Sequence, residues 1–334
     1  MAGVPGGPQP PVSPVDDHGR ERRPAVVLPQ SLCVLERTAE LSLDAFGSLD
    51  GPGPFTGAPA PGLGPPYPGD RPEYGAAFAA ALAEERRLIT ALRDAILPGP
   101  GASVDLPSVR IAVRYLPAGE AALLGGDWYE LTPLPDGRIF LGVGDTSGHG
   151  AAAVARMAQL RPALLGLAMT GASPESLLGW LNTLVLTRFP ETTATVVCGY
   201  LDVARLRFTW AQAGHPAPIL VRRGGARRIG APEGVILGAV PDPRYRVRCT
   251  ALEPGDLLLM FTDGLVERRT RDIGAGMGLA VKAARAVAGQ PDLDAGLDML
   301  IDALGGPNPE DDACLLALQV VDCAERGEPA RYAA

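Results

Sequence analysis

Four aspartates stand at the ends of hydrophobic runs, where strands are expected to give way to turns. They are Asp127 in GGDWYE, Asp145 in VGDTSGHG, Asp263 in FTDGLVE and Asp311 in PEDDACLLAL, with Asp312 next to the last of them. A single aspartate in such a turn commonly caps the local backbone and does no chemistry. Several that follow different strands can converge, and Mg²⁺ and Mn²⁺ prefer carboxylate, carbonyl and water oxygens. The pattern therefore favours a site for hard divalent cations.

The elements that must position these aspartates are predicted from the periodicity of apolar residues. Strands are predicted over residues 109–115, 138–144, 193–202, 206–212, 217–222, 246–252, 256–262 and 314–321. Helices are predicted over 151–169, from a Ser173 cap with Pro174 in the first turn, and once or twice between 277 and 304. Closely successive strands pair antiparallel, because a parallel crossover needs a dozen or more residues. The element order predicts an α/β domain in which sheets are layered with helices.

The chain divides by composition into four segments. Residues 1–72 are rich in proline and glycine, which predicts a mostly disordered leader. Residues 73–98 form a predicted linker or signalling helix that ends at Pro98. The predicted catalytic domain spans 99–322, and 323–334 form a flexible tail. In the helix, apolar residues repeat at intervals of four and three, and Glu85 alone interrupts them: Phe78, Leu82, Ile89, Leu92 and Ile96. This seam predicts either packing on its own domain or a dimerising, signal-transmitting contact.

Charge and composition exclude several classes of function. The chain has 30 lysines and arginines against 38 aspartates and glutamates, a net charge of −8, whereas nucleic-acid binding needs a dense basic surface. The five cysteines include no CxxC pair, so neither a zinc site nor a disulfide framework is expected. No apolar run approaches the roughly 18 residues of a membrane helix, and the first residues do not resemble a signal peptide. We expect a soluble, cytoplasmic protein without nucleic-acid or membrane partners.

Beyond single aspartates, an ordered series of motifs runs from residue 114 to residue 318. The series is RYLPA (114–118), GGDWYE (125–130), DGRIFLGVGDTSGHG (136–150), MAQLR (157–161), AGHPAP (213–218), LEPGDLLLMFTDGLVERR (252–269) and DDACLLAL (311–318). With these motifs, residues 81–321 resemble the bacterial branch of the protein phosphatase 2C (PPM) family, of the stage II sporulation E type. Each motif alone is weak, but their common order makes a chance match very improbable.

The resemblance implies a fold and a set of ligands. The fold is a four-layer αββα sandwich, in which two central, mainly antiparallel sheets are flanked by helices. The site holds two divalent cations, Mn²⁺ or Mg²⁺, at one end of the sandwich. By position, Asp127 and Asp145 lie between the metals, Thr146 offers its backbone carbonyl, and Asp263 and Asp311 complete the site, with Asp312 as the rival of Asp311.

The implied activity is metal-dependent hydrolysis of phosphoserine or phosphothreonine, with Asp127, Asp145 and Asp263 as the catalytic residues. Two metal ions about 3.5–4 Å apart lower the pKa of a bridging water and neutralise the phosphoryl oxygens. No phospho-enzyme is needed, so the cysteines can be inert. His149 and His215 are candidates for the acid that protonates the leaving oxygen. A helix-entry role for the first and a turn role for the second explain them as well, and neither is assigned.

Substrate and partners also follow only from the resemblance. The bacterial branch implies a phosphorylated anti-anti-sigma protein of the STAS class as substrate, in a partner-switching pathway that frees a sigma factor. A homodimer through residues 73–97 is a further hypothesis.

Two competing interpretations remain. The glycines of LGVGDTSGHG mimic a dinucleotide loop, but their spacing differs from GxGxxG by one residue and Asp145 would repel a pyrophosphate. The other interpretation is a catalytically inactive phosphatase fold that acts as a binding module.

Overall fold

The computed structural model describes residues 102–118, 125–288, 290 and 292–321, together with single positions between 80 and 97. The predicted leader (1–72), the predicted tail (323–334) and the whole seam of the predicted 73–98 helix lie outside these residues. The dimer and signalling hypotheses for that helix therefore stay predictions. Among the described residues, no helix combines the length and the apolar character needed to cross a bilayer.

Two antiparallel sheets form the centre of the domain. The first has the order β1 (Ser103–Asp105), β2 (Val109–Leu116), β11 (Ala313–Val320), β10 (Leu257–Phe261), β7 (Ile219–Arg222) and β8 (Gly225–Arg228). The second has the order β3 (Trp128–Pro133), β4 (Ile139–Thr146), β5 (Ala194–Asp202), β6 (Arg207–Ala213) and β9 (Arg248–Ala251). Neighbouring strands within each sheet pair antiparallel. The antiparallel pairing expected from the short connections is confirmed.

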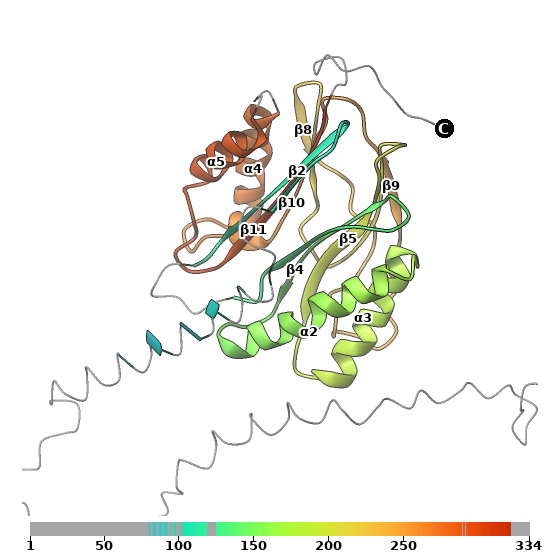
Figure 1. The fold of residues 1–334 in the computed structure, drawn as a ribbon. Helices are drawn as coiled ribbons and strands as arrows, with labels where there is room; N and C mark the ends of the chain where they lie inside the picture. The colour runs from blue at the N-terminus through green and yellow to red at the C-terminus, as the bar shows by residue number, and fades with distance from the viewer. Residues whose placement is uncertain are drawn as a thin grey trace, which may run out of the picture. The chain divides into compact units, whose positions relative to one another are not determined.

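Helices cover the outer face of each sheet (Figure 1). The helices α2 (Ala151–Ala168) and α3 (Pro174–Arg188) pack on the second sheet, where Phe140 and Tyr200 contribute to one apolar cluster. The helices α4 (Ile273–Val287) and α5 (Leu293–Ala303) pack on the first sheet. A third cluster, which includes Tyr129 and Met260, fills the space between the sheets. Three apolar layers thus separate four layers of structure, and the predicted αββα sandwich is confirmed.

The helix boundaries are close to those predicted from local signals. Ser173 occupies the N-cap of α3 and Pro174 its first turn, although the Ser173 hydroxyl bonds the Ser176 hydroxyl (3.0 Å) and caps no backbone N–H. Pro162 lies inside α2, which continues through it to Ala168. Buried apolar side chains on both sides of Pro162 hold this helix against the second sheet, so packing outweighs the lost backbone hydrogen bond.

Three strands were not predicted from the sequence. The strands β1 and β8 are short and contain no buried residue, so neither shows an apolar pattern. The strand β3 is buried at its first three positions, Trp128, Tyr129 and Glu130, because both of its faces are covered there. A strand that is covered on both faces does not alternate between polar and apolar residues. The omission matters, because β3 begins directly after Asp127.

Candidate metal centre

Strand register brings the predicted aspartates to one end of both sheets. In the second sheet, Trp128 pairs with Gly144, so Asp127 before β3 lies beside Asp145 near the end of β4. In the first sheet, Phe261 pairs with Leu315. This register places the turn that begins at Asp263, just after β10, beside the acidic pair that precedes β11. Each sheet thus contributes carboxylates to the same edge of the sandwich.

The aspartates act on one another electrostatically. Burial raises the pKa of Asp127 well above its usual range, and the charges of Asp145 and Asp311 add to the rise. Burial, followed by the charge of Asp263, raises the pKa of Asp145 to about 7. The same two causes, burial first, raise the pKa of Asp311 to about 6. A hydrogen bond between Asp127 and Asp145 offsets part of this repulsion. The four side chains still form one cluster of interacting carboxylates, whose combined charge is costly without a cation.

A threonine that was not predicted as a site residue holds Asp127. The Thr262 hydroxyl donates to Asp127 Oδ2 (2.8 Å) and accepts from the backbone N–H of Cys314 (2.8 Å). Both threonine and aspartate are buried. The hydroxyl thereby fixes the rotamer of Asp127 and links the first sheet to the second. The signal in the sequence was a polar residue at the end of the otherwise apolar run LLLMF.

The two adjacent aspartates before β11 have different environments. Asp312 is fully buried, and its carboxylate accepts hydrogen bonds from the Tyr115 hydroxyl (2.7 Å) and from the backbone N–H groups of Ala118 (2.6 Å) and Gly125 (2.8 Å). It therefore joins the RYLPA segment to the GGDWYE segment. Asp311 is exposed. Among the described backbone N–H groups and hydroxyl side chains, the Asp311 carboxylate interacts with the backbone N–H of Asp312 alone, whereas Asp312 accepts three hydrogen bonds.

Two glycines allow the loops around the aspartates to approach closely. A Cβ on Gly126 would collide with both the hydroxyl and the carbonyl oxygen of Thr146. Thr146 itself is buried, and its N–H donates to the Gly126 carbonyl (3.3 Å). A Cβ on Gly264 would collide with the Asp312 carbonyl oxygen. Glycine at these positions lets the loop segments that carry the carboxylates pack against one another.

The two candidate histidines lie in different surroundings. His149 is exposed, directly before α2. His215 is buried between the sheets, with Nε2 3.0 Å from the Phe261 carbonyl oxygen and Nδ1 2.9 Å from the Thr195 hydroxyl. A carbonyl only accepts, so Nε2 carries the proton and Nδ1 accepts from Thr195. Burial lowers the pKa of His215 to about 3, so it is a neutral cross-link between β5 and the end of β10.

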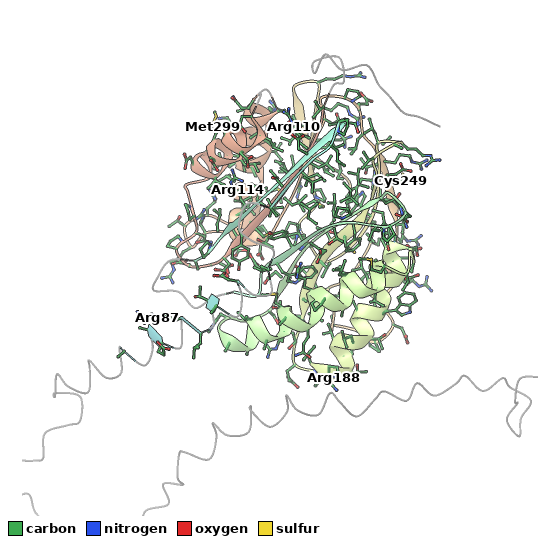
Figure 2. All side chains as sticks on the ribbon, viewed as in Figure 1. Arg87, Arg110, Arg114, Arg188, Cys249 and Met299 are labelled. Carbon is green, nitrogen blue, oxygen red and sulfur yellow. The ribbon has the colours of Figure 1, made fainter. Side chains whose placement is uncertain are left out.

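Two arginines of the motif series bind structural partners. The Arg161 guanidinium on α2 lies 3.0 Å from Glu130 Oε2 and donates to the Tyr129 carbonyl, which joins the helix to β3. Arg114, labelled on β2 in Figure 2, is bonded to α5 through Asp294 (2.6 Å) and Asp298 (3.0 Å). Within the described part of the chain, no arginine or lysine lies within ion-pair distance of the four predicted metal-ligand aspartates.

The donor chemistry of this cluster fits a hard cation, although its carboxylates do not converge tightly on one point. Among the described residues, no group of three or more histidine, cysteine, aspartate or glutamate side chains has the geometry to hold a metal ion. The cluster nevertheless offers only oxygen donors, lacks a cationic side chain and repels itself. Mg²⁺ and Mn²⁺ select such oxygen-rich sites. Binding would require small side-chain movements toward the ion.

Comparison with known proteins agrees with the fold and with the motif series. The family model for stage II sporulation protein E (SpoIIE) matches residues 135–321. Phosphoserine phosphatase RsbU from Bacillus subtilis is 27% identical over 154 residues, which are 46% of this chain and 46% of that protein. Protein IcfG from a Synechocystis species is 22% identical over 194 residues, 50% of this chain and 30% of that protein. The match thus spans less than half the length of each of these curated relatives.

Solved structures share the same architecture. The RsbU and RsbW domains of Rv1364c from Mycobacterium tuberculosis match with a TM-score of 0.60 and 34% identity, over 66% of this chain and 63% of that one. The SiaA-PP2C domain of Pseudomonas aeruginosa matches with a TM-score of 0.59 over 73% of this chain and 98% of that one. Its identity is 20%, so it supports the fold alone.

Proposed function

The chain belongs to the stage II sporulation protein E (SpoIIE) family, and from this premise we propose that it is a metal-dependent protein serine/threonine phosphatase. One observation carries the proposal: carboxylates from both sheets meet at one edge, where burial and neighbouring carboxylates raise the pKa of Asp127, Asp145 and Asp311, and they face no arginine or lysine among the described residues. A bound cation would offset the repulsion among these carboxylates. RsbU, a relative, is named a phosphoserine phosphatase.

Each carboxylate has a proposed role. Asp127 and Asp145 would hold two divalent cations, Mn²⁺ or Mg²⁺, with the Thr146 carbonyl as a further ligand, and Asp263 and Asp311 would complete the site. When bound, the cations supply an activated water and neutralise the phosphoryl oxygens. The chain's own residues hold the ligands in place. Thr262 keeps Asp127 in one rotamer, and a second partner of this kind commonly tunes a metal ligand.

The environments of the adjacent acidic pair support Asp311 as the ligand. A carboxylate that already accepts three hydrogen bonds, as Asp312 does, would lose them on turning toward a cation. Asp311 would lose at most the one from the backbone N–H of Asp312. Its pKa is raised to about 6, by burial and then by the charge of Asp263, so a bound cation would favour its ionised form.

For the substrate, we propose a phosphorylated anti-anti-sigma protein of the STAS class in the cytoplasm. The support is the likeness to RsbU and to the structure of the RsbU and RsbW domains from M. tuberculosis. The proposed site is open at the edge of the sandwich, where Asp263 is half-buried and Asp311 exposed. Such an edge admits a phosphorylated side chain on a folded protein more readily than a deep pocket would.

Hydrolysis in the presence and absence of metal tests the proposal. The purified chain is expected to release phosphate from a phosphoserine peptide with Mn²⁺ or Mg²⁺, to stop in EDTA and to recover when excess metal is returned. A matched alanine peptide controls for contaminating phosphate. Full turnover in EDTA would overturn the metal mechanism. Peptide binding without turnover in any metal would instead favour the inactive binding module.

A further inference from the structure

A cavity of about 650 Å³ is lined by residues that follow Asp263 and precede Asp311 in the chain. One wall is the turn 268–271, which follows the FTDGLVE motif, and the other is the segment 304–310, which precedes Asp311. The turn is a tight hairpin in which the Arg268 and Arg271 backbones exchange two hydrogen bonds, of 3.1 and 2.9 Å. This pairing places both arginine side chains on a fixed backbone, and the cavity is lined by both.

The two arginines are anchored to main-chain carbonyls, and each keeps one buried nitrogen without a partner. Arg271 donates from Nε to the Val266 carbonyl (3.1 Å) and from Nη1 to the Leu304 carbonyl (3.2 Å), and its Nη2 is buried and unbonded. Arg268 donates from Nη2 to the Gly306 carbonyl (2.5 Å), and its Nε is buried and unbonded. Each unmade bond of a buried cation is costly, so these donors favour an acceptor.

The acidic residue in the cavity wall does not supply that acceptor. Glu310 Oε1 is 2.9 Å from Nε of Arg269, the exposed arginine at the tip of the turn. Neither Arg268 nor Arg271 has a carboxylate within ion-pair distance in the described ranges. Burial lowers the pKa of Arg268, and the neighbouring charge of Arg271 lowers it further. Glu310 is the one carboxylate among the described residues that line the cavity, and it pairs with Arg269 and not with Arg268 or Arg271.

The cavity is rigidly connected to the candidate metal centre. Asn308 is buried, and its Nδ2 donates to the carbonyls of Gly264 and Glu267 (3.1 Å each), which clamps the cavity wall to the turn that begins at Asp263. Asp311 follows Glu310 directly in the chain. Because extended residues span about 3.3–3.6 Å each, a peptide whose phosphoserine meets the carboxylates can place a side chain a few residues away in this cavity.

We propose that the Arg268–Arg271 cavity is an oxyanion subsite, which accepts a carboxylate or a second phosphoryl group of the polypeptide whose phosphoserine is hydrolysed next to it. The proposal rests on the proposed phosphatase function and adds a substrate preference to it. The ligand is an oxyanion because fixed guanidinium donors pair well with carboxylate and phosphoryl oxygens. Acidic residues or a second phosphorylation near the phosphoserine would then improve hydrolysis.

Paired peptides test this preference. A phosphoserine peptide with aspartates within about five residues of the phosphoserine, a doubly phosphorylated peptide and a neutral peptide with asparagines are compared by kcat/KM in Mn²⁺. We expect the wild-type chain to favour either anionic peptide by at least about tenfold, as one or two charge-assisted hydrogen bonds would give. The ratio should fall close to one in Arg271→Gln and in Arg268→Gln. Because the ratio is taken within one preparation, it does not depend on the folded fraction.

A matched control removes charge elsewhere. Arg246→Gln removes an exposed arginine that pairs with Glu233 (2.9 Å), far in sequence from the turn, and should keep the wild-type ratio. If this control lost the preference for anionic peptides to the same extent, the preference would depend on the net charge of the protein, and the subsite proposal would be overturned. Equal kcat/KM for anionic and neutral peptides in the wild-type chain would overturn it directly.

A second measurement separates this subsite from the phosphatase proposal. In the metal-stripped chain, sulfate should raise the melting temperature above its value in chloride at equal ionic strength, and the rise should be smaller in Arg271→Gln and Arg268→Gln. If no peptide is hydrolysed but sulfate still protects through these arginines, the phosphatase proposal fails and the anion site stands. Sulfate protection without a preference for anionic peptides would mean a free-anion site and overturn the role in substrate binding. No protection would overturn the anion site itself.

Discussion

The strand β10 has an aspartate near each end, and the two have opposite environments. Asp256 precedes the strand, is 1% exposed and is bonded by the Arg222 guanidinium at 2.6 and 2.9 Å. It also accepts from the Glu253 backbone N–H (2.8 Å). Asp263 follows the strand, is half-buried and has no arginine or lysine within ion-pair distance among the described residues. One carboxylate has its cation built into the fold, and the other does not.

The difference separates structural from functional carboxylates. A buried carboxylate with an arginine and a backbone donor is already satisfied, and its removal would damage the fold. A carboxylate among other carboxylates is unsatisfied until a cation arrives, and its neutralisation would relieve repulsion. Substitutions at the two ends of β10 should therefore fail in opposite ways, one in stability and one in activity.

The largest expected effect is on the activity of Asp263→Asn. We expect phosphatase activity to fall more than about 100-fold, because changes to residues that only support a metal ligand already cost 10–100-fold. The melting temperature of the metal-free variant should hold or rise, because one charge of the repelling cluster is gone. Asp127→Asn should behave in the same way. Phosphate release and thermal unfolding of the same preparations measure both effects.

The matched variant at the other end of the strand is Asp256→Asn. It leaves Arg222 without its partner, and we expect a loss of about 3 kcal/mol of unfolding free energy with near-normal activity per folded molecule. Denaturant titration gives the first quantity and turnover of the folded fraction gives the second. The comparison would break if Asp263→Asn unfolded the chain, or if Asp256→Asn abolished turnover in a fully folded protein.

The adjacent acidic pair gives the next contrast. Asp311→Asn should lose most activity and little stability. Asp312→Asn should lose about 1–3 kcal/mol of stability, because an amide cannot accept all three hydrogen bonds that converge on the carboxylate. Its loss of activity should be the smaller one. Equal and mild losses of activity at both positions would exclude this pair from the metal site.

A smaller effect is expected at Thr262. Thr262→Val removes the hydroxyl that holds Asp127 and should weaken Mn²⁺ affinity about 10–100-fold. Thr262→Ser keeps the hydroxyl and is the control, so it should restore most of the affinity. Metal titrations of turnover give the apparent affinities. If valine and serine behaved alike, the hydroxyl would have no role in positioning Asp127.

The smallest effect is a pH dependence at His215. The pKa of this histidine is about 3 in the folded chain, below its ordinary value of 6.5, so the unfolded chain binds more protons between these values. Stability should therefore fall as pH decreases from about 6.5 toward 3, with a contribution of up to about 1.4 kcal/mol per pH unit. In His215→Asn, the free energy of unfolding should fall less steeply as the pH decreases over this range. Parallel curves for both proteins would assign the acid sensitivity to other groups.

Much of the fold and of the site could be predicted because the signals were local. Alternation predicted β2, the turn pair Asp136-Gly137 predicted the start of β4, and the aspartates in glycine-containing turns indicated the candidate site. The strand β3 could not be predicted by alternation, since both of its faces are covered. Thr262 and the difference between Asp311 and Asp312 depend on which loops meet in space. A single sequence does not show that Tyr115, Ala118 and Gly125 converge on the Asp312 carboxylate and not on its neighbour.

Calorimetric titration of Mn²⁺ onto the metal-stripped chain tests the central claim most directly. The account predicts saturable binding of two ions to the wild-type protein, the same binding to folded Asp256→Asn, and loss of at least one ion in Asp263→Asn and in Asp127→Asn. Absence of Mn²⁺ binding by the wild-type chain, or undiminished binding by both site variants, would contradict it.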